Sequence, residues 1–417
     1  MRATVALAVF IAAAWAAVAA GQSAQKAPPP ATVVLAVELP DNPTVGARLF
    51  VEKGCVRCHA LGTDEGRVGP DLGRLHFRGT VLDLAGAFWN HSPVMHEKMA
   101  DLKIRPPVLT SGEMADLVGF LTAYRYYLTE VGQPSDPAAG AAVFKEKGCA
   151  SCHAAAGDWQ RPGPSLDPFR GRASAIMLAQ AMWNHGPEMA SVMKGRGVPW
   201  PKFAGHEMGD LLAYLRAGTP ASGPNPMYYE PGSPRRGREL FTSKRCVACH
   251  AIEGVGGRGG PDLGARGRDL VESVPAIAGL MWNHSQGMSA EFARRGISRV
   301  TFSGQEMADI IAYLYFVNYA NVRGTPARGG QLFVEKCSAC HAIGAKRIGP
   351  DLASVPELND PIAIMAAMWN HSTLMDQELR RRGLAWPLLA PGEAADLTAF
   401  LLTTRSHAPA VSAGGGR

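Results

Sequence analysis

All eight cysteines of the 417-residue sequence occur in four copies of one short pattern, Cys-x-x-Cys-His-Ala. The first cysteines of successive copies are 94, 97 and 91 residues apart, and no cysteine lies outside the pattern. The cysteines and histidines of the four copies are Cys55, Cys58 and His59; Cys149, Cys152 and His153; Cys246, Cys249 and His250; Cys337, Cys340 and His341. Whatever chemistry these side chains support is therefore repeated four times.

Covalent attachment of haem c explains the pattern best. Two cysteines three residues apart reach the two vinyl groups on one edge of a porphyrin, and the next residue then holds its imidazole under the ring as the proximal iron ligand. Zinc would require cysteine pairs from copies about ninety residues apart, although each copy already carries its own histidine. A thioredoxin-type pair would lie in a βαβ context, and disulfides leave the recurring histidine unexplained. The sequence predicts four haem c groups, with one iron each.

Each cysteine motif lies in a repeat with four further landmarks. Gly-x-x-(Leu/Val)-Phe precedes it, Gly-Pro-(Asp/Ser)-Leu and Trp-Asn-His-x-x-x-Met follow, and an amphipathic segment such as GEMADLVGFL ends the repeat. The spacing of apolar residues at i, i+3 and i+4 in that segment predicts a helix. Strand signals are nearly absent outside 31–39. We therefore expect an all-α fold of four tandem small domains, each wrapped around one covalent haem.

Segments rich in Gly, Pro and Ser separate the repeats and predict interdomain linkers. The expected domains span 41–131, 138–218, 232–322 and 327–405. Before them, Met1-Arg2 and the apolar run 3–20 match a secretory signal peptide at 1–20, followed by a linker at 21–40. An uncleaved membrane anchor is the alternative interpretation of this run. Export predicts a periplasmic or secreted protein.

Each repeat resembles a small class I cytochrome c domain, and the resemblance covers almost everything after residue 40. In that family a Gly/Phe helix at the start crosses a Leu/aromatic helix at the end. The resemblance pairs Gly46 and Phe50 with Leu117 and Phe120; the later copies of the second helix offer Leu211/Tyr214, Ile310/Tyr313 and Leu397/Phe400. The Gly-Pro segment, with Pro70, Pro164, Pro261 or Pro350, resembles the family loop whose proline carbonyl accepts the ring N–H of the proximal histidine.

The sixth iron ligand is predicted to be the methionine of Trp-Asn-His-x-x-x-Met. These methionines are Met95, Met189, Met288 and Met375, which lie 34 to 38 residues after the proximal histidines. Pro93 and Gly186-Pro187 are expected to end the preceding helix and place the methionine in a loop, as the resemblance implies. The histidines four residues earlier are the alternative ligands: His91, His185, His284 and His371.

Four six-coordinate haems on one chain predict an electron carrier or conduit without catalytic residues. The expected partners are redox proteins that act as donor and acceptor. One alternative is an electron-transfer subunit of a larger membrane-associated redox complex, and another is a multihaem reductase or peroxidase. The formal charge of +6 arises from 42 basic and 36 acidic residues that are scattered along the chain, so no nucleic-acid partner is expected.

Overall fold

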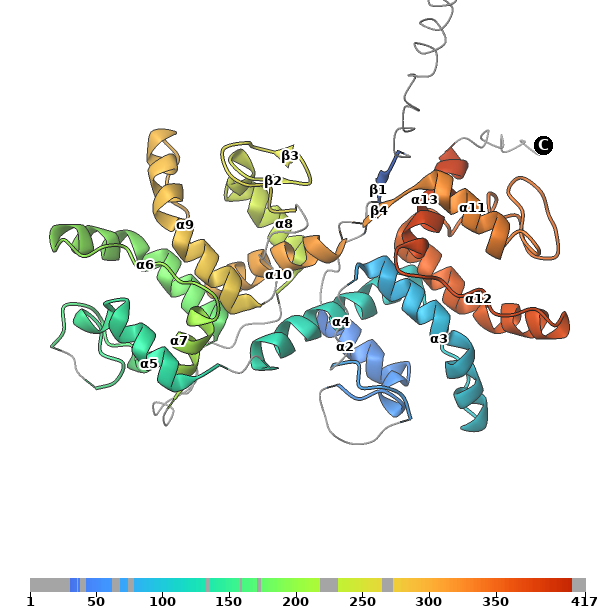
Figure 1. Ribbon diagram of the computed structural model, residues 1–417, viewed down its shortest axis with the longest axis horizontal. Coiled ribbons are helices and arrows are strands. Elements are labelled where there is room, and N and C mark those ends of the chain that lie inside the picture. The colour runs from blue at the N-terminus through green and yellow to red at the C-terminus, as the bar shows by residue number, and fades with distance from the viewer. Residues whose placement is uncertain are drawn as a thin grey trace, which may run out of the picture.

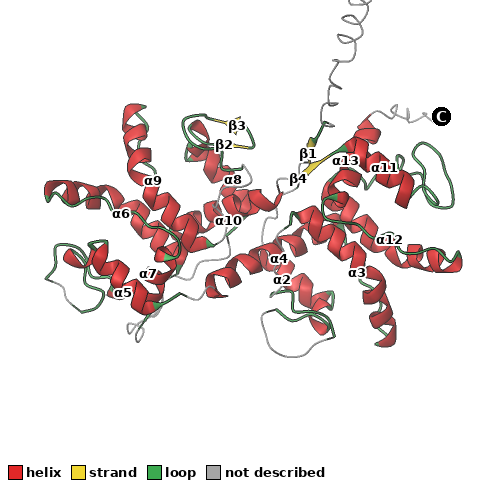
Figure 2. Ribbon diagram, viewed as in Figure 1, coloured by secondary structure: helices red, strands yellow, loops and turns green. Residues whose placement is uncertain are grey.

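The computed structural model describes residues 31–35, 37, 43–61, 68–73, 79–132, 135–157, 160–170, 174–217, 232–264, 273–320 and 322–406. The predicted signal peptide and most of the predicted linker at 21–40 lie outside these residues. Helices dominate the described chain, as expected (Figure 2). Helices overrun the predicted domain limits by one residue at Gly132, Pro137, Pro326 and Ser406.

Three long helices form each repeat, and the first and last of them cross. Repeat 1 contains α2 (Pro43–Glu52), α3 (Val81–Asp101) and α4 (Ser111–Gly132). Repeat 2 contains α5 (Pro137–Glu146), α6 (Ala175–Gly195) and α7 (Glu207–Arg216). Repeat 3 contains α8 (Pro234–Ser243), α9 (Val274–Arg294) and α10 (Gly304–Ala320). Repeat 4 contains α11 (Pro326–Lys336), α12 (Pro361–Arg381) and α13 (Glu393–Ser406).

A glycine allows the first and last helices of each repeat to touch. A Cβ atom at Gly46 would lie 2.0 Å from the backbone oxygen of Asp116, and one at Gly140 would lie 1.9 Å from that of Asp210. The same clash would occur at Gly237 and Gly329. The phenylalanine four residues later meets an aromatic ring of the last helix in every repeat, with ring centroids 5.5–5.8 Å apart. The predicted Gly/Phe crossing is therefore present four times.

The described strands form two short antiparallel ribbons. Strand β1 (Val33–Leu35) pairs with β4 (Val322–Gly324), and β2 (Ala251–Ile252) pairs with β3 (Val255–Gly256). Leu35 and Val322 are buried, and α13 contacts both strands of the first ribbon. This ribbon ties the segment before repeat 1 to the connection between repeats 3 and 4.

The repeats associate in two pairs that do not follow their order in the chain. Helix α6 packs against α9, which joins repeats 2 and 3, and α3 packs against α12, which joins repeats 1 and 4. Figure 1 shows repeats 2 and 3 in the left half and repeats 1 and 4 in the right half, with α4 and α10 between them. Helix α4 contacts α9 and α10 across the two halves. The sequence did not predict this pairing.

A Trp-Asn dipeptide on each middle helix holds the partner repeat. The Trp89 indole N–H donates to the Pro387 carbonyl at 2.7 Å, while the Asn90 side chain donates to the Leu389 carbonyl and accepts from the Leu389 N–H, both at 2.8 Å. We call this contact set the Trp-Asn clasp. The other three clasps join Trp369-Asn370 to Pro107 and Leu109, Trp183-Asn184 to Val300 and Phe302, and Trp282-Asn283 to Pro201 and Phe203.

Pro93 and Pro187 do not end the helices that carry them, so the prediction that the helices end there and leave the methionines in a loop is wrong. Helices α3 and α6 continue to Asp101 and Gly195. A proline inside a helix has no N–H for the carbonyl four residues earlier, here that of Trp89 or Trp183. The Ser92 hydroxyl donates to the Trp89 carbonyl at 2.7 Å, and the Arg299 guanidinium of repeat 3 donates to the Trp183 carbonyl. Because both carbonyls have another donor, the helices tolerate the prolines.

Candidate haem sites

The four predicted proximal histidines have the same hydrogen-bond partner. In repeats 1 to 3 the Cys-x-x-Cys segment forms a short 3₁₀ turn, for example Cys55–Arg57, and the histidine follows directly. The Nδ1 atoms of the histidines lie 2.9–3.3 Å from the carbonyl oxygens of Pro70, Pro164, Pro261 and Pro350. An imidazole that donates from Nδ1 to a carbonyl has an unprotonated Nε2, which is the form that binds a metal.

The glycine before each of these prolines packs against the imidazole. A Cβ atom at Gly69 would lie 2.6 Å from Cε1 of His59, and one at Gly260 would lie 2.5 Å from Cε1 of His250. Gly163 and Gly349 approach their histidines equally closely. The Gly-Pro dipeptide thus fixes both the rotation and the tautomer of the ring.

All eight cysteines are free thiols of intermediate burial. Burial raises the pKa of the first thiol in each motif, to about 11 for Cys246 and Cys337. A thioether forms when the S–H of a cysteine adds across a vinyl group, and none of the eight cysteines is held in a disulfide that would prevent this.

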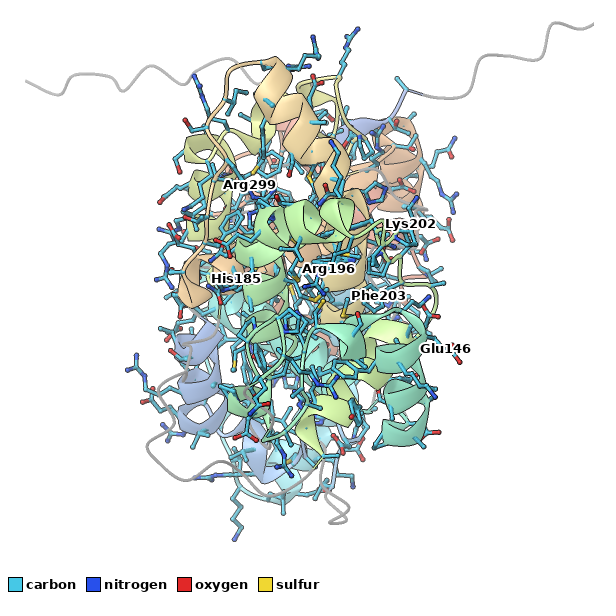
Figure 3. The ribbon with its side chains drawn as sticks, turned by 90° about the vertical axis from the view of Figure 1, so that its left-hand side faces the viewer. Glu146, His185, Arg196, Lys202, Phe203 and Arg299 are labelled. Carbon is cyan, nitrogen blue, oxygen red and sulfur yellow. The ribbon has the colours of Figure 1, made fainter. Side chains whose placement is uncertain are left out.

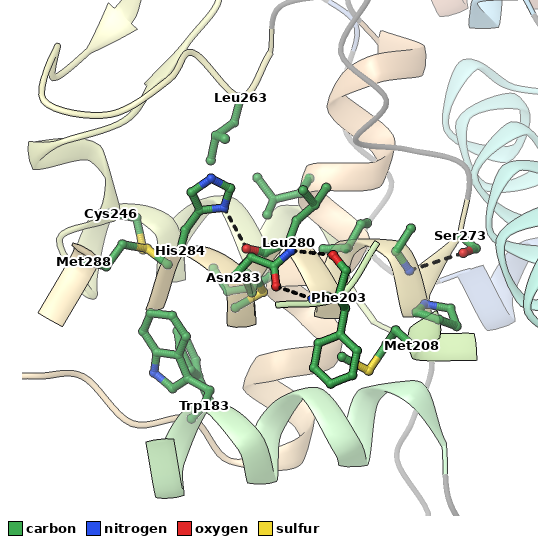
Figure 4. Close-up of a pocket in the computed structure, with 18 of the residues that line it drawn as sticks. Trp183, Phe203, Met208, Cys246, Leu263, Ser273, Leu280, Asn283, His284 and Met288 are labelled. Carbon is green, nitrogen blue, oxygen red and sulfur yellow. Dashed lines mark hydrogen bonds between the residues drawn. The ribbon is translucent and has the colours of Figure 1, made fainter. Parts of the chain in front are cut away.

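A cavity of about 1090 Å³ opens beside the cysteine motif of repeat 3, just above the range of ligand pockets of roughly 300–1,000 Å³. Cys246, Cys249 and His250 line it, and so do His284 and Met288 of α9. Figure 4 labels Cys246, His284 and Met288 among the lining residues. Much of the remaining wall is apolar, including Phe241, Leu263, Phe292 and Ile310. A large, mostly apolar cavity lined by the predicted proximal histidine and by both candidate distal ligands is of a size and character that fits a porphyrin.

The two candidate distal ligands share one continuous helix in every repeat. The Nδ1 atoms of His91, His284 and His371 lie 2.7–2.9 Å from the carbonyl oxygen four residues earlier, whereas Nδ1 of His185 lies 3.6 Å from the Glu188 carboxylate. These four histidines are exposed. The four methionines are partly buried against the core. Since the methionines lie on the helix and not in a loop, the loop argument for methionine does not apply.

The profile of the cytochrome c family matches residues 137–219, 234–316 and 326–405, together more than half of the sequence. The chain belongs to the cytochrome c family. Repeat 1 lies outside the matched residues, but it has the same cysteine motif, the same histidine–proline contact and the same helix crossing as the other three. No curated protein and no solved structure matches the chain.

Cytochrome c domains imply haem c and haem-based electron transfer, and the four cysteine motifs are consistent with four haems. Among the described residues, no helix combines the length and the apolar character needed to cross a membrane. Sequence reasoning treated the tryptophan and asparagine only as neighbours of the ligand candidates. Their recurrence in all four repeats was the signal that they have a function of their own.

Proposed function

We propose that this cytochrome c is an exported electron carrier with four haem c groups, one attached to each repeat as in a tandem class I cytochrome c. The observation that carries the proposal is the hydrogen bond from a histidine next to each cysteine pair to a proline carbonyl, which recurs in all four repeats. The two cysteines of each motif would attach the haem, and the histidine would bind its iron on the proximal side. When bound, each haem supplies a one-electron redox couple.

The protein residues would set the environment of that couple. Each proline carbonyl makes the proximal imidazole a stronger electron donor to iron, since it accepts a hydrogen bond from the Nδ1–H group. Apolar side chains around the repeat 3 cavity would surround a bound haem and limit its contact with water. Redox proteins that act as donor and acceptor are the partners we expect, in the periplasm or outside the cell, with docking to a membrane redox complex as the alternative.

We propose Met95, Met189, Met288 and Met375 as the distal ligands. In repeat 3, Met288 and His284 both line the cavity that Cys246 lines (Figure 4), but Met288 is half-buried and His284 is exposed. The methionines also pack against the hydrophobic core, which would hold their side chains in place as iron ligands. Methionine–histidine ligation raises the reduction potential of a haem relative to stronger donor pairs.

Haem counting tests the proposed function. The mature protein should contain four haems that resist acid-organic extraction, since thioether bonds do not dissociate. Replacing Cys55 and Cys58 by Ala should leave three, with the loss confirmed by the intact mass. Extractable haem, or zinc bound in its place, would refute the proposal.

Rates of electron transfer and of substrate turnover distinguish an electron carrier from an enzyme. The reduced protein should pass electrons to small redox proteins and should turn over nitrite or peroxide slowly. A large high-spin fraction in the isolated protein would support a reductase or peroxidase instead.

A further inference from the structure

We propose that the four haems are coupled as two pairs, those of repeats 2 and 3 and those of repeats 1 and 4, and that the Trp-Asn clasps are the coupling elements. The inference rests on the proposed function, because it concerns the haems that the repeats would hold. In this proposal each clasp asparagine helps to position two haems, the one of its own repeat and the one of the partner repeat. These asparagines are Asn90, Asn184, Asn283 and Asn370.

The clasp lies next to the distal ligand candidates. Asn184 directly precedes His185 and lies five residues before Met189, on the same helix α6. Its amide donates to the Phe302 carbonyl at 2.8 Å and accepts from the Phe302 N–H at 3.0 Å. A two-point contact of this kind fixes the rotation and the axial position of α6 near the haem ligand.

The clasped segment is also part of the haem site of the partner repeat. Phe302 lies just before α10, the helix that crosses α8, and α8 leads to Cys246. Phe302 itself lines the repeat 3 cavity, together with Ile310 of α10. If α6 moves, Phe302 is expected to move with it. Such a movement would change the wall of the repeat 3 cavity.

Side chains of repeat 2 form part of the repeat 3 cavity directly. Trp183, Phe203 and Met208 line it from the repeat 2 side (Figure 4). Trp183 lies on the same helix as the candidate distal ligands of repeat 2, and its side chain also lines the repeat 3 cavity. The potential of a haem depends on its surroundings and on the donor strength of its ligands. A change in the repeat 2 clasp should therefore alter the repeat 3 haem as well.

Different side chains complete the two interfaces. In repeats 1, 3 and 4 a buried serine hydroxyl donates to the carbonyl of the clasp tryptophan. Repeat 2 has Gly186 at this position, and Arg299 from repeat 3 donates to the Trp183 carbonyl and lies over the Trp183 ring, 4.8 Å from its centroid. Arg299 and Phe203, the repeat 3 and repeat 2 residues of this interface, are labelled in Figure 3. Because all four clasps act within a pair, we expect coupling within pairs.

Four matched variants of the holoprotein test this: Asn90→Ala, Asn184→Ala, Asn283→Ala and Asn370→Ala. The readout is the set of paramagnetically shifted haem methyl proton resonances of the oxidised protein, together with the four midpoint potentials. Asn184→Ala and Asn283→Ala should shift the resonances and potentials of the same two haems. Asn90→Ala and Asn370→Ala should shift those of the other two. This comparison needs no assignment of resonances to individual repeats.

Four variants that each move a different single haem would overturn the proposal, as would any variant that moves all four. Trp183→Phe serves as a milder variant if an asparagine variant folds poorly, since it removes the indole N–H donated to Val300 and keeps a ring in place. It should shift the same two haems as Asn184→Ala, and a shift confined to one haem would again refute pairwise coupling. The haem count of the unmodified protein tests the proposed function separately.

Discussion

Asn90 and Leu389 are 299 residues apart in the sequence, yet one side-chain amide satisfies both the N–H and the C=O of the same backbone residue. The reciprocal contact is also present, because Asn370 of repeat 4 forms the same two hydrogen bonds with the backbone of Leu109 in repeat 1. The two repeats therefore hold each other through equivalent surfaces, as the subunits of a symmetric dimer do. In this protein both surfaces belong to one chain.

Asn90→Ala should lower the free energy of unfolding by about 1–3 kcal/mol, because two hydrogen bonds of roughly 0.5–1.5 kcal/mol each are lost. Chemical denaturation of the holoprotein measures the change. Gln377→Ala on α12 is the control, since Gln377 is exposed and such substitutions change stability by less than about 0.5 kcal/mol. Equal effects of the two substitutions would show that the clasp does not stabilise the pair.

Gly140→Ala should destabilise repeat 2 by about 1–3 kcal/mol or more, because the new methyl group would overlap the Asp210 backbone oxygen where α5 crosses α7. We expect less haem to be attached to that repeat during maturation, measured by haem content after expression. Gly112→Ala on α4 is the matched control, since no atom lies within 4 Å of the added Cβ. That substitution should be neutral or stabilising by up to about 1 kcal/mol, since alanine favours helices. A well-tolerated Gly140→Ala would contradict the close crossing.

An ion pair joins the C-terminal end of the first helix to the start of the last helix in every repeat and predicts loss of stability in acid. The four pairs are Lys53–Glu113, Lys147–Glu207, Lys244–Glu306 and Lys336–Glu393, with N–O distances of 2.6–2.8 Å. Burial alone would raise the pKa of Glu393, but its bonds with the Lys336 ammonium and the Ala390 N–H lower that pKa below the usual 4.5. The pKa values of the other three glutamates are lowered too.

A carboxyl whose pKa is lower in the folded state contributes stability above its unfolded pKa, and the contribution is lost as pH falls through the folded value. The free energy of unfolding should therefore decrease as pH falls below about 4.5. Glu393→Gln should reduce stability at pH 7 and flatten this decrease in urea titrations at several pH values. Glu357→Gln, at an exposed position, is the control. An unchanged pH profile for Glu393→Gln would contradict the assignment.

The distal ligand is tested by Met95→Ala and His91→Ala. If methionine binds the iron, Met95→Ala should remove the far-red sulfur-to-iron(III) absorption of one haem and lower its potential, since methionine raises it. His91→Ala should preserve that absorption. A high-spin haem after His91→Ala but not after Met95→Ala would assign the ligands to His91, His185, His284 and His371.

The sequence predicted the local features and missed the association of the repeats. Helical periodicity, Cys-x-x-Cys-His and the Gly/Phe spacing depend on neighbouring residues, so the helix crossing at Gly46 could be predicted from the family resemblance. The bond between Trp89 and Pro387 joins positions 298 residues apart, and nothing near either residue specifies the other. Helix α6 passes through Pro187 because Arg299, from another repeat, supplies the missing donor. A prediction from local residues alone cannot include that donor.

The pairing of the repeats is nested, so the residues of the inner pair are made before those of the outer pair. Repeats 2 and 3 are adjacent in the chain, so their interface can close as soon as both have been made. The Asn90 clasp of repeat 1 requires Leu389 of repeat 4. At synthesis rates of about 5–20 residues per second, the chain between Asn90 and Leu389 takes roughly 15–60 s to produce. During that interval the Trp89 surface has no partner within the chain, and β1 has none until residues 322–324 have been made. The residues that complete the outer pair are thus the last to be made, after those of the inner pair.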